Sequence, residues 1–192
     1  DLLHGQSIKR LMALPGDELT PPPVEQNTRA ITIDAPPDAV WPWLVQMGAG
    51  RGGWYSYDWI DNGGRPSATQ LIPGSTTPSV GDVVPALPGA TDAFVVVAVE
   101  EERHLVLGVP MPDGSQRATW GLILEPRTDG TRLLARARLA RLQLEIRGRL
   151  LVVPDVPARW LAGPAHAIMQ RRQLIGLRSR AESATAERPA PM

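Results

Sequence analysis

Short runs of alternating apolar and polar residues occupy the chain from about residue 80 to residue 140. Turn pairs rich in proline and glycine separate or precede these runs, at Pro73-Gly74, Pro88-Gly89, Asp113-Gly114 and Asp129-Gly130. Consecutive runs joined by short turns predict an antiparallel meander. The predicted strands cover residues 82–86, 94–100, 105–109, 118–125 and 131–139.

The last of these runs has the clearest alternation. Leucine and alanine occupy one face, and the alternate positions Arg132, Arg136 and Arg138 predict a solvated face on the other side. The inward set is Leu133, Ala135, Ala137 and Leu139. Because Leu142, Leu144 and Ile146 continue the alternation, we expect one unusually long strand.

Helical patterns precede the meander. A weak helix is predicted over residues 2–14, and prolines 21–23 predict a stiff connector to a strand at residues 31–33. Two short helices follow. The first has a buried face at Val40, Trp43, Leu44 and Met47 and is shortened by Pro42. The second begins with Ser56 as N-cap and stops at Asn62-Gly63.

A long helix over residues 164–183 closes the chain. Leu161, Ala165, Ile168 and Ile175 form one apolar stripe, flanked by Met169, and Leu174, Leu177 and Ala181 lie on the opposite side. A helix that is apolar on both sides is either covered by a loop or used in self-association. We therefore expect an N-terminal extension (1–27), one α+β domain (28–183) and a disordered tail (184–192).

Composition narrows the class of protein. Twenty basic residues balance 20 acidic ones, which gives no electrostatic reason to expect nucleic acid as a partner. The absence of cysteine excludes disulfides and thiolate nucleophiles, and the three histidines lack metal-ligand spacing, so no metal or cofactor is predicted. Apolar runs far shorter than the ~20 residues of a membrane span predict no stable membrane insertion and a cytoplasmic location. The chain begins at Asp1 without an initiator Met. Removal of an upstream targeting or membrane segment from the native chain is therefore an expectation that the sequence leaves open.

Six of the nine aromatic residues fall within residues 41–59, on either side of a glycine-rich turn. Crowded Trp and Tyr rings around a flexible turn predict the wall or mouth of a cavity. Residues 48–53 match the G-x-G-x-x-G dinucleotide fingerprint, but that site needs a strand before the glycines and a helix after them. Here a helix precedes them, so we interpret the glycines as a hinge.

Several side chains near this turn are candidates for chemistry, each with a structural alternative. Asp58, beside Tyr55 and Tyr57, could serve as an acid or base in an apolar site, or could stabilise a helix turn or pair with Arg51. Arg51 could bind a ligand anion or a neighbouring acid. Arg172 could anchor a ligand or extend to water, and Met169 could line a cavity or fill the core.

The order of elements and several motifs resemble the SRPBCC superfamily of START-like helix-grip proteins, nearest its bacterial polyketide cyclase-like or lipid-transport-like branch. The likeness rests on residues 14–19, 28–37, 40–48, 51–59, 80–84, 119–120, 131–134 and 169–182. It implies a seven-stranded antiparallel sheet around a long C-terminal helix, with a hydrophobic cavity between them, and it transfers no catalytic residues. Residues 61–69, short and without histidine, and residues 141–157 depart from the family pattern.

Three functions are compatible with this pattern. The first is binding of a hydrophobic or amphipathic small molecule, with Arg51, Trp54, Tyr55, Tyr57, Asp58, Trp120, Met169 and Arg172 as ligand-binding residues. The second is a cyclase or dehydratase of secondary metabolism that uses Asp58 or Tyr57. The third is an interaction module or homodimer that uses Leu174, Leu177 and Ala181.

Overall fold

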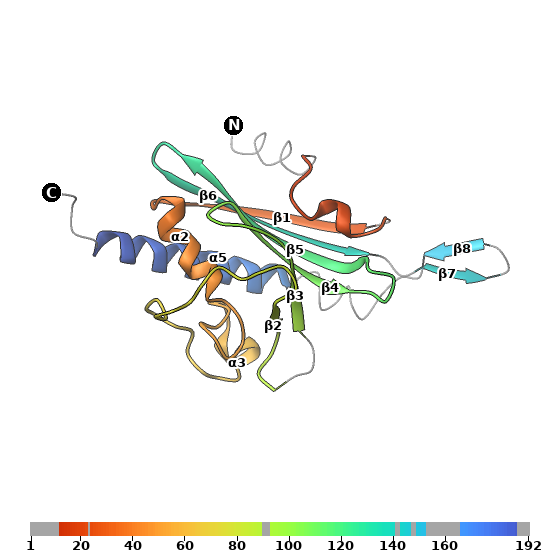
Figure 1. The fold of residues 1–192 in the computed structure, drawn as a ribbon, viewed down its shortest axis with the longest axis horizontal. Helices are drawn as coiled ribbons and strands as arrows, with labels where there is room; N and C mark the ends of the chain where they lie inside the picture. Colours follow the sequence, from red (N-terminus) through yellow and green to blue (C-terminus); the bar gives the residue numbers. More distant parts are fainter. Residues whose placement is uncertain are drawn as a thin grey trace.

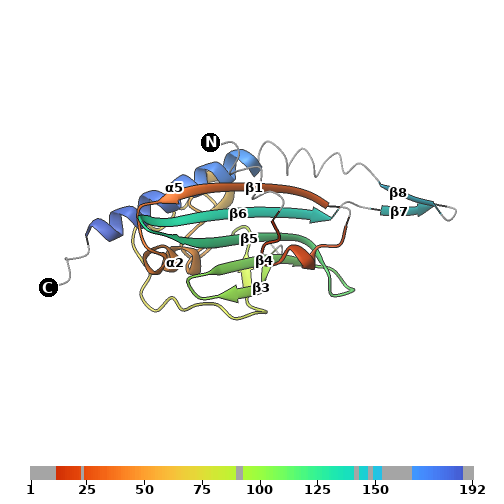
Figure 2. The ribbon, with the colours of Figure 1, turned by 90° about the horizontal axis from the view of Figure 1, so that it is seen from above.

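A curved antiparallel sheet forms the body of the protein, and the long helix α5 (His166–Ala186) lies across its concave face (Figures 1 and 2). The computed structural model describes residues 12–22, 24–89, 93–140, 143–146, 149–152 and 166–187. Within these residues the sheet has six strands in the order β1-β6-β5-β4-β3-β2. The strands are β1 (Val24–Ile33), β2 (Val83–Pro85), β3 (Ala93–Glu100), β4 (His104–Pro110), β5 (Gln116–Arg127) and β6 (Gly130–Ala140).

The five predicted strands of the meander are confirmed, each within a few residues of its expected bounds. Strand β1 is longer than predicted, because it pairs with β6 along its whole length, from Val24 opposite Ala140 to Ile33 opposite Thr131. The α+β helix-grip architecture predicted from the sequence is therefore confirmed, with six strands in this sheet over the described residues where the resemblance implied seven.

The expectation of one very long final strand is wrong. Strand β6 ends at Ala140, and β7 (Gln143–Ile146) pairs with β8 (Arg149–Val152) in a separate two-stranded sheet that extends beyond the main one (Figure 2). Alternation marks extended backbone but carries no information on the sheet to which that backbone belongs.

Two short helices follow β1, as predicted. Helix α2 (Pro37–Val45) begins with a proline in its first turn and buries Val40, Trp43 and Leu44 against the sheet. Helix α3 (Asp58–Asp61) is a single turn, and its N-cap is Tyr57 instead of the predicted Ser56. The long segment between α3 and β2 lies on the same side of the sheet as α2 (Figure 1).

Helix α5 closes the core with a face other than the predicted one. Leu174, Leu177 and Ala181 are buried in the same core cluster as Trp43 and Leu133, whereas Ile168 is 57% exposed. The partner-facing stripe expected at Leu174, Leu177 and Ala181 is therefore wrong, because these residues are core. Leu161 and Ala165 of the predicted stripe lie outside the described residues.

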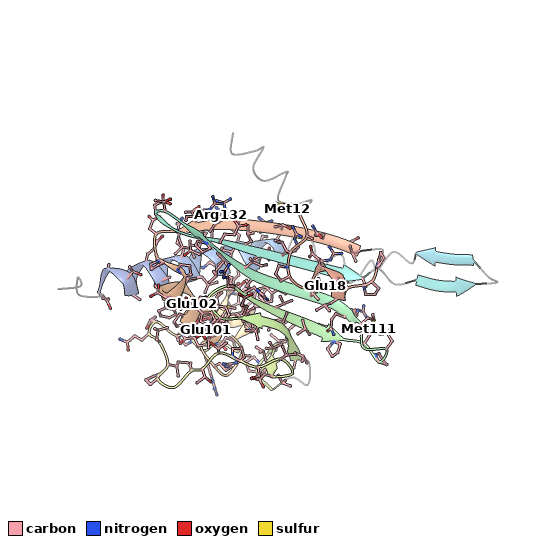
Figure 3. All side chains as sticks on the ribbon, turned by 45° about the horizontal axis from the view of Figure 1, so that its top comes forward. Met12, Glu18, Glu101, Glu102, Met111 and Arg132 are labelled. Atoms are coloured by element: carbon pink, nitrogen blue, oxygen red, sulfur yellow. The ribbon has the colours of Figure 1, made fainter. Side chains whose placement is uncertain are left out.

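The outer face of the sheet is partly covered by residues 12–22, which include the short 3-10 helix η1 (Asp17–Leu19; Figure 3). Under this segment Arg136 is 3% exposed, and its guanidinium forms an ion pair with Asp17 and donates to the Met12 carbonyl at 2.7 Å. The prediction that Arg136 is solvated is therefore wrong. The helix predicted over residues 2–14 lies almost entirely outside the described residues.

Candidate functional site

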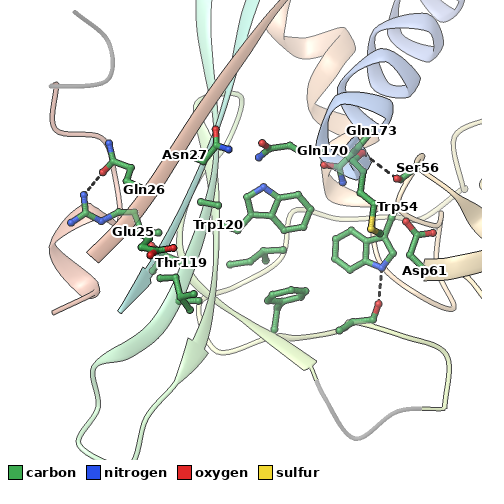
Figure 4. A pocket seen from close by; sticks show the side chains of 18 of the residues that line it. Glu25, Gln26, Asn27, Trp54, Ser56, Asp61, Thr119, Trp120, Gln170 and Gln173 are labelled. Atoms are coloured by element: carbon green, nitrogen blue, oxygen red, sulfur yellow. Dashed lines mark hydrogen bonds between the residues drawn. The ribbon is translucent and has the colours of Figure 1, made fainter. Parts of the chain in front are cut away.

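A cavity of about 550 Å³ lies between the concave face of the sheet and the first half of α5 (Figure 4). Small side chains on the sheet create part of this space, since Ala118 of β5 and Ala137 of β6 both line it. Ala137 is the register partner of Trp120, so one large ring stands beside one short side chain. Further along the strands, Leu122, Leu133 and Ala135 belong to one buried core cluster with residues of α2 and α5.

Three aromatic rings form one wall of the cavity. The Trp54 ring centroid lies 5.5 Å from that of Trp120 and 5.8 Å from that of Phe94, and Phe94 lies 6.0 Å from Trp120. The indole N–H of Trp54 donates to the Ala86 carbonyl at 2.9 Å, which fixes the ring. Such edge-on and tilted ring pairs are the arrangements that aromatic side chains prefer.

Phe94 was missing from the residues predicted to line a cavity. The strand pattern could have placed it, because Phe94 and the fully buried Val96 are two residues apart on β3 and so share a face. Of the sequence candidates, the structure brings Trp54, Trp120 and Met169 together around this cavity.

Three of the polar side chains that line the cavity are buried and have unmet hydrogen-bonding capacity. Asp61 comes from α3 and is 5% exposed, and Gln170 and Gln173 come from α5 and are each 2% exposed. Among the described residues no group makes a well-formed hydrogen bond to either Asp61 carboxyl oxygen, to the Gln170 amide, or to the Gln173 oxygen. The Gln173 nitrogen has only a weak acceptor, the Met47 sulfur at 3.7 Å. These groups were also missing from the sequence prediction.

Burial raises the pKa of the Asp61 carboxyl to about 6, and the neighbouring Asp58 carboxylate adds to the rise. The backbone of Asp61, the Ser56 hydroxyl and the backbone of Tyr57 offset part of this rise. The Ser56 hydroxyl also donates to the Met169 carbonyl at 3.1 Å. A carboxyl group that titrates near neutral pH inside an apolar cavity can exchange a proton with a bound molecule or accept a hydrogen bond from it.

Asp58, the acid that the sequence prediction favoured, lies outside this cavity. Its two oxygens accept hydrogen bonds from the Ser67 backbone N–H at 2.9 Å and from the Ser67 hydroxyl at 2.5 Å, so it holds the loop that follows α3. Together with Tyr57 and Arg172, it lines a separate hollow on the surface. The structure thus separates these three predicted site residues from the aromatic wall.

The remaining two candidates have structural contacts. Arg51 donates to the Val45 carbonyl at 2.9 Å, at the C-terminal end of α2, and borders another surface hollow. Tyr55 is 2% exposed; its hydroxyl donates to the Trp43 carbonyl at 3.1 Å and accepts from the Gln46 amide at 3.0 Å. Burial raises the pKa of Tyr55 to about 12, so its hydroxyl stays protonated. Both side chains hold the fold together beside the cavity instead of lining it.

The aromatic window therefore has several roles. Trp41 and Trp43 belong to the core with Tyr55, and Trp59 is 76% exposed. Of the six aromatic rings of this window only Trp54 lines the main cavity, so the expectation that these rings together form a cavity mouth is wrong.

The glycine turn is a closed loop after α2. Gly48 and Gly53 exchange backbone hydrogen bonds of 3.2 and 3.1 Å, and both have a positive φ. No helix begins directly after this loop, so it lacks the helix N-terminus that a pyrophosphate site needs. The structure shows these glycines in a hydrogen-bonded turn, and their role as a flexible hinge stays a prediction.

Two further properties of the described part of the chain bear on function. None of its helices combines the length and apolar character needed to cross a bilayer. Within the same residues, no three His, Cys, Asp or Glu side chains lie close enough together to hold a metal ion.

The chain is similar in structure to several solved proteins, but the comparisons find no close relative by sequence. No protein-family model matches the sequence, and no curated protein matches it significantly. Solved structures similar to it include the Polyketide_cyc-like protein Cgl2372 of Corynebacterium glutamicum, at 16% identity, 90% coverage of this chain, 100% of that one and a TM-score of 0.42. The AHSA1-like protein of Rhizobium etli has 16% identity, and the match covers 90% of this chain and 94% of that one, with a TM-score of 0.43. The Aha1 dimer of Colwellia psychrerythraea has 15% identity, covers 82% of this chain and 96% of its own, and has a TM-score of 0.45.

Proposed function

We propose that this protein binds a hydrophobic or amphipathic small molecule in the cavity between its sheet and α5. The observation that carries the proposal is the 550 Å³ apolar space walled by Trp54, Phe94 and Trp120. A space of this size falls within the range of ligand pockets, which are typically apolar with a few placed polar groups. The resemblance to SRPBCC proteins led to the same expectation from the sequence.

Filling the cavity from within tests the proposal. In Ala137→Phe a ring would project from β6 into the space beside Trp120. We expect wild-type protein to enhance the emission of the neutral probe N-phenyl-1-naphthylamine, and Ala137→Phe to reduce its affinity at least about tenfold. Thr32→Phe is the matched control, because Thr32 is exposed on a neighbouring strand. Equal affinity in all three proteins would contradict binding in this cavity.

A second candidate function is proton-transfer catalysis in the same cavity, of the cyclase or dehydratase type. Asp61 favours it, because a buried carboxyl with a pKa of about 6 can act as base and then as acid. In a dehydration its carboxylate would take a proton from the carbon beside a carbonyl. The resulting acid would return that proton to the departing hydroxyl, and one water would leave.

Molecules retained by protein from its native host distinguish the two functions. If Asp61 catalyses dehydration, Asp61→Asn should retain a molecule heavier by one water than the molecule retained by the wild type. The same molecule in both proteins would favour binding alone.

A cytoplasmic location and a homodimer remain predictions for this protein. Because Leu177 is core, a dimer would have to use a surface other than the one first expected. Sedimentation of the full chain and fractionation of its host would check the two predictions.

A further inference from the structure

We propose that Asp61, Gln170 and Gln173 form a polar recognition site inside the cavity that selects an uncharged ligand with a hydroxyl or carbonyl group over an anionic one. This inference rests on the proposed binding function and specifies its ligand class. The three side chains come from two elements far apart in sequence, α3 and α5, and all three line the cavity beside the aromatic wall. Figure 4 shows Gln170 beside Trp120, and Asp61 beside Trp54.

The first argument is the unmet hydrogen-bonding capacity of these groups. All three side chains are at least 95% buried, yet five of their polar atoms lack a well-formed hydrogen bond to any described residue. Buried polar groups without partners are costly, and native proteins retain few of them. A ligand group that both donates and accepts hydrogen bonds would pair with the Gln170 amide, and a donor on the ligand would pair with the Asp61 oxygens.

The neighbouring protein groups supply these bonds only in part. The Ser56 hydroxyl and the backbone of Asp61 and Tyr57 lie close enough to lower the pKa of Asp61, but none of them forms a well-formed hydrogen bond to its carboxyl oxygens. Ser56, which lies next to Asp61 in the cavity lining, donates to the Met169 carbonyl. Asp58, three residues before Asp61, accepts from Ser67 on the other side of α3. The Gln170 amide and the Gln173 oxygen, and part of the capacity of the Asp61 carboxyl, are therefore left for a guest or for water.

The second argument is the sign of charge along the cavity. Arg138 is the basic residue among the described lining residues, and its guanidinium binds Gln26 at 2.5 Å and lies 3.6 Å from Asp17 on the outer face. Glu25 and Asp61 are the acidic ones. No described cation thus faces the carboxylate of an anionic guest, and Asp61 would repel it across a cavity of low polarity.

Three naphthalenes of equal ring size test this selection at pH 7.5: naphthalene, 2-naphthol and 2-naphthoate. Equilibrium dialysis measures their affinities without depending on tryptophan emission. We expect 2-naphthol to bind about 5- to 10-fold more tightly than naphthalene, as one or two additional hydrogen bonds would give. We expect 2-naphthoate to bind at least about tenfold more weakly than 2-naphthol.

Variants then assign the selection to residues. Gln170→Leu should reduce the preference for 2-naphthol over naphthalene to about twofold or less, because it removes the amide. Arg171→Leu, an exposed neighbour on α5, is its control. Asp61→Asn should bring 2-naphthoate binding to within about threefold of 2-naphthol, because it removes the negative charge but keeps a polar group of the same shape. Asp58→Asn, outside the cavity, should leave the rejection of 2-naphthoate unchanged.

The outcomes separate this inference from the function on which it rests. If naphthalene binds but all three compounds have equal affinity, or if 2-naphthoate binds best, the cavity binds guests and the selection fails. Selection that persists in the Asp61→Asn/Gln170→Leu double variant would also overturn the inference. If none of the three compounds binds to the wild type, the proposed function fails as well.

Discussion

Gly176 of α5 lies directly against the backbone of Tyr55: a Cβ atom at Gly176 would come within 2.4 Å of the Tyr55 carbonyl oxygen. One turn later on the helix, the Arg180 guanidinium lies 4.6 Å from the centroid of the Tyr55 ring. Ser56, the next residue of the loop, donates to the Met169 carbonyl. The loop that carries Trp54 and leads to Asp61 is therefore attached to α5 at three points.

We expect Gly176→Ala to destabilise the protein by about 1–3 kcal/mol, because the new methyl group would push α5 away from the Tyr55 carbonyl. In an exposed helix position the same change would stabilise by about 0.5–1 kcal/mol, so the sign of the effect is diagnostic. Urea unfolding followed by circular dichroism measures it. Ser179→Ala, exposed on the same helix, should change stability by less than about 0.5 kcal/mol. A stabilising Gly176→Ala would show that the two elements are farther apart.

Asp61 should make the stability of the empty protein fall as pH rises. Its pKa is higher in the folded chain, about 6 against 3.8, so folding favours its protonated form. That contribution is fully present below pH 3.8 and is lost as pH rises through about 6. Asp61→Asn should therefore stabilise the protein by about 2 kcal/mol at pH 7.5 and have little effect at pH 3.5. Thermal unfolding of both proteins across this range, with Asp129→Asn at an exposed position as control, checks the sign.

Removing the carboxylate of Asp17 should cost about 3 kcal/mol, because it would leave the guanidinium of Arg136 buried without its ion-pair partner. The neighbouring Glu18 is exposed, so Glu18→Ala should have little effect. Denaturant unfolding of the two variants provides the comparison. Equal stabilities would mean that the segment over residues 12–22 does not contribute to the fold.

Leu177→Glu should prevent folding instead of changing the assembly state, because Leu177 is fully buried between α5 and the sheet. A carboxylate without a partner at that position would cost more than about 4 kcal/mol. Ile168→Glu, on the exposed side of the same helix, should leave the fold intact. A folded Leu177→Glu protein with altered sedimentation would restore the partner-facing interpretation.

The strands could be predicted from the sequence because their side chains alternate and glycine-containing turns mark their ends. The face of α5 could not, for a physical reason. Its inner face carries Gln170, Gln173, Leu174, Leu177 and Ala181, and each of these except the adjacent pair 173 and 174 lies three or four residues from the next. The two glutamines border a cavity, so the inner stripe is polar in its first half. The apolar periodicity of the sequence therefore predicts Ile168 and Ile175 on the inner face instead.

The site was harder to predict than the fold. Asp58 and Asp61 are three residues apart on one helical turn, and composition does not tell which of them faces inward. The contact of Asp58 with Ser67 decides it, and that contact depends on the path of a loop. Likewise, Trp54 and Tyr55 are adjacent in the sequence, yet one lines the cavity and the other lies in the core beside Gln46.

The hydrogen bond between the Trp54 indole and the Ala86 carbonyl has a consequence for the kinetics of binding. That ring is already held in place and packed against Phe94 and Trp120. Binding of a guest would therefore cost little conformational entropy in this wall of the cavity. Such preorganisation favours association limited by diffusion into the opening, with little rearrangement of the backbone on complex formation.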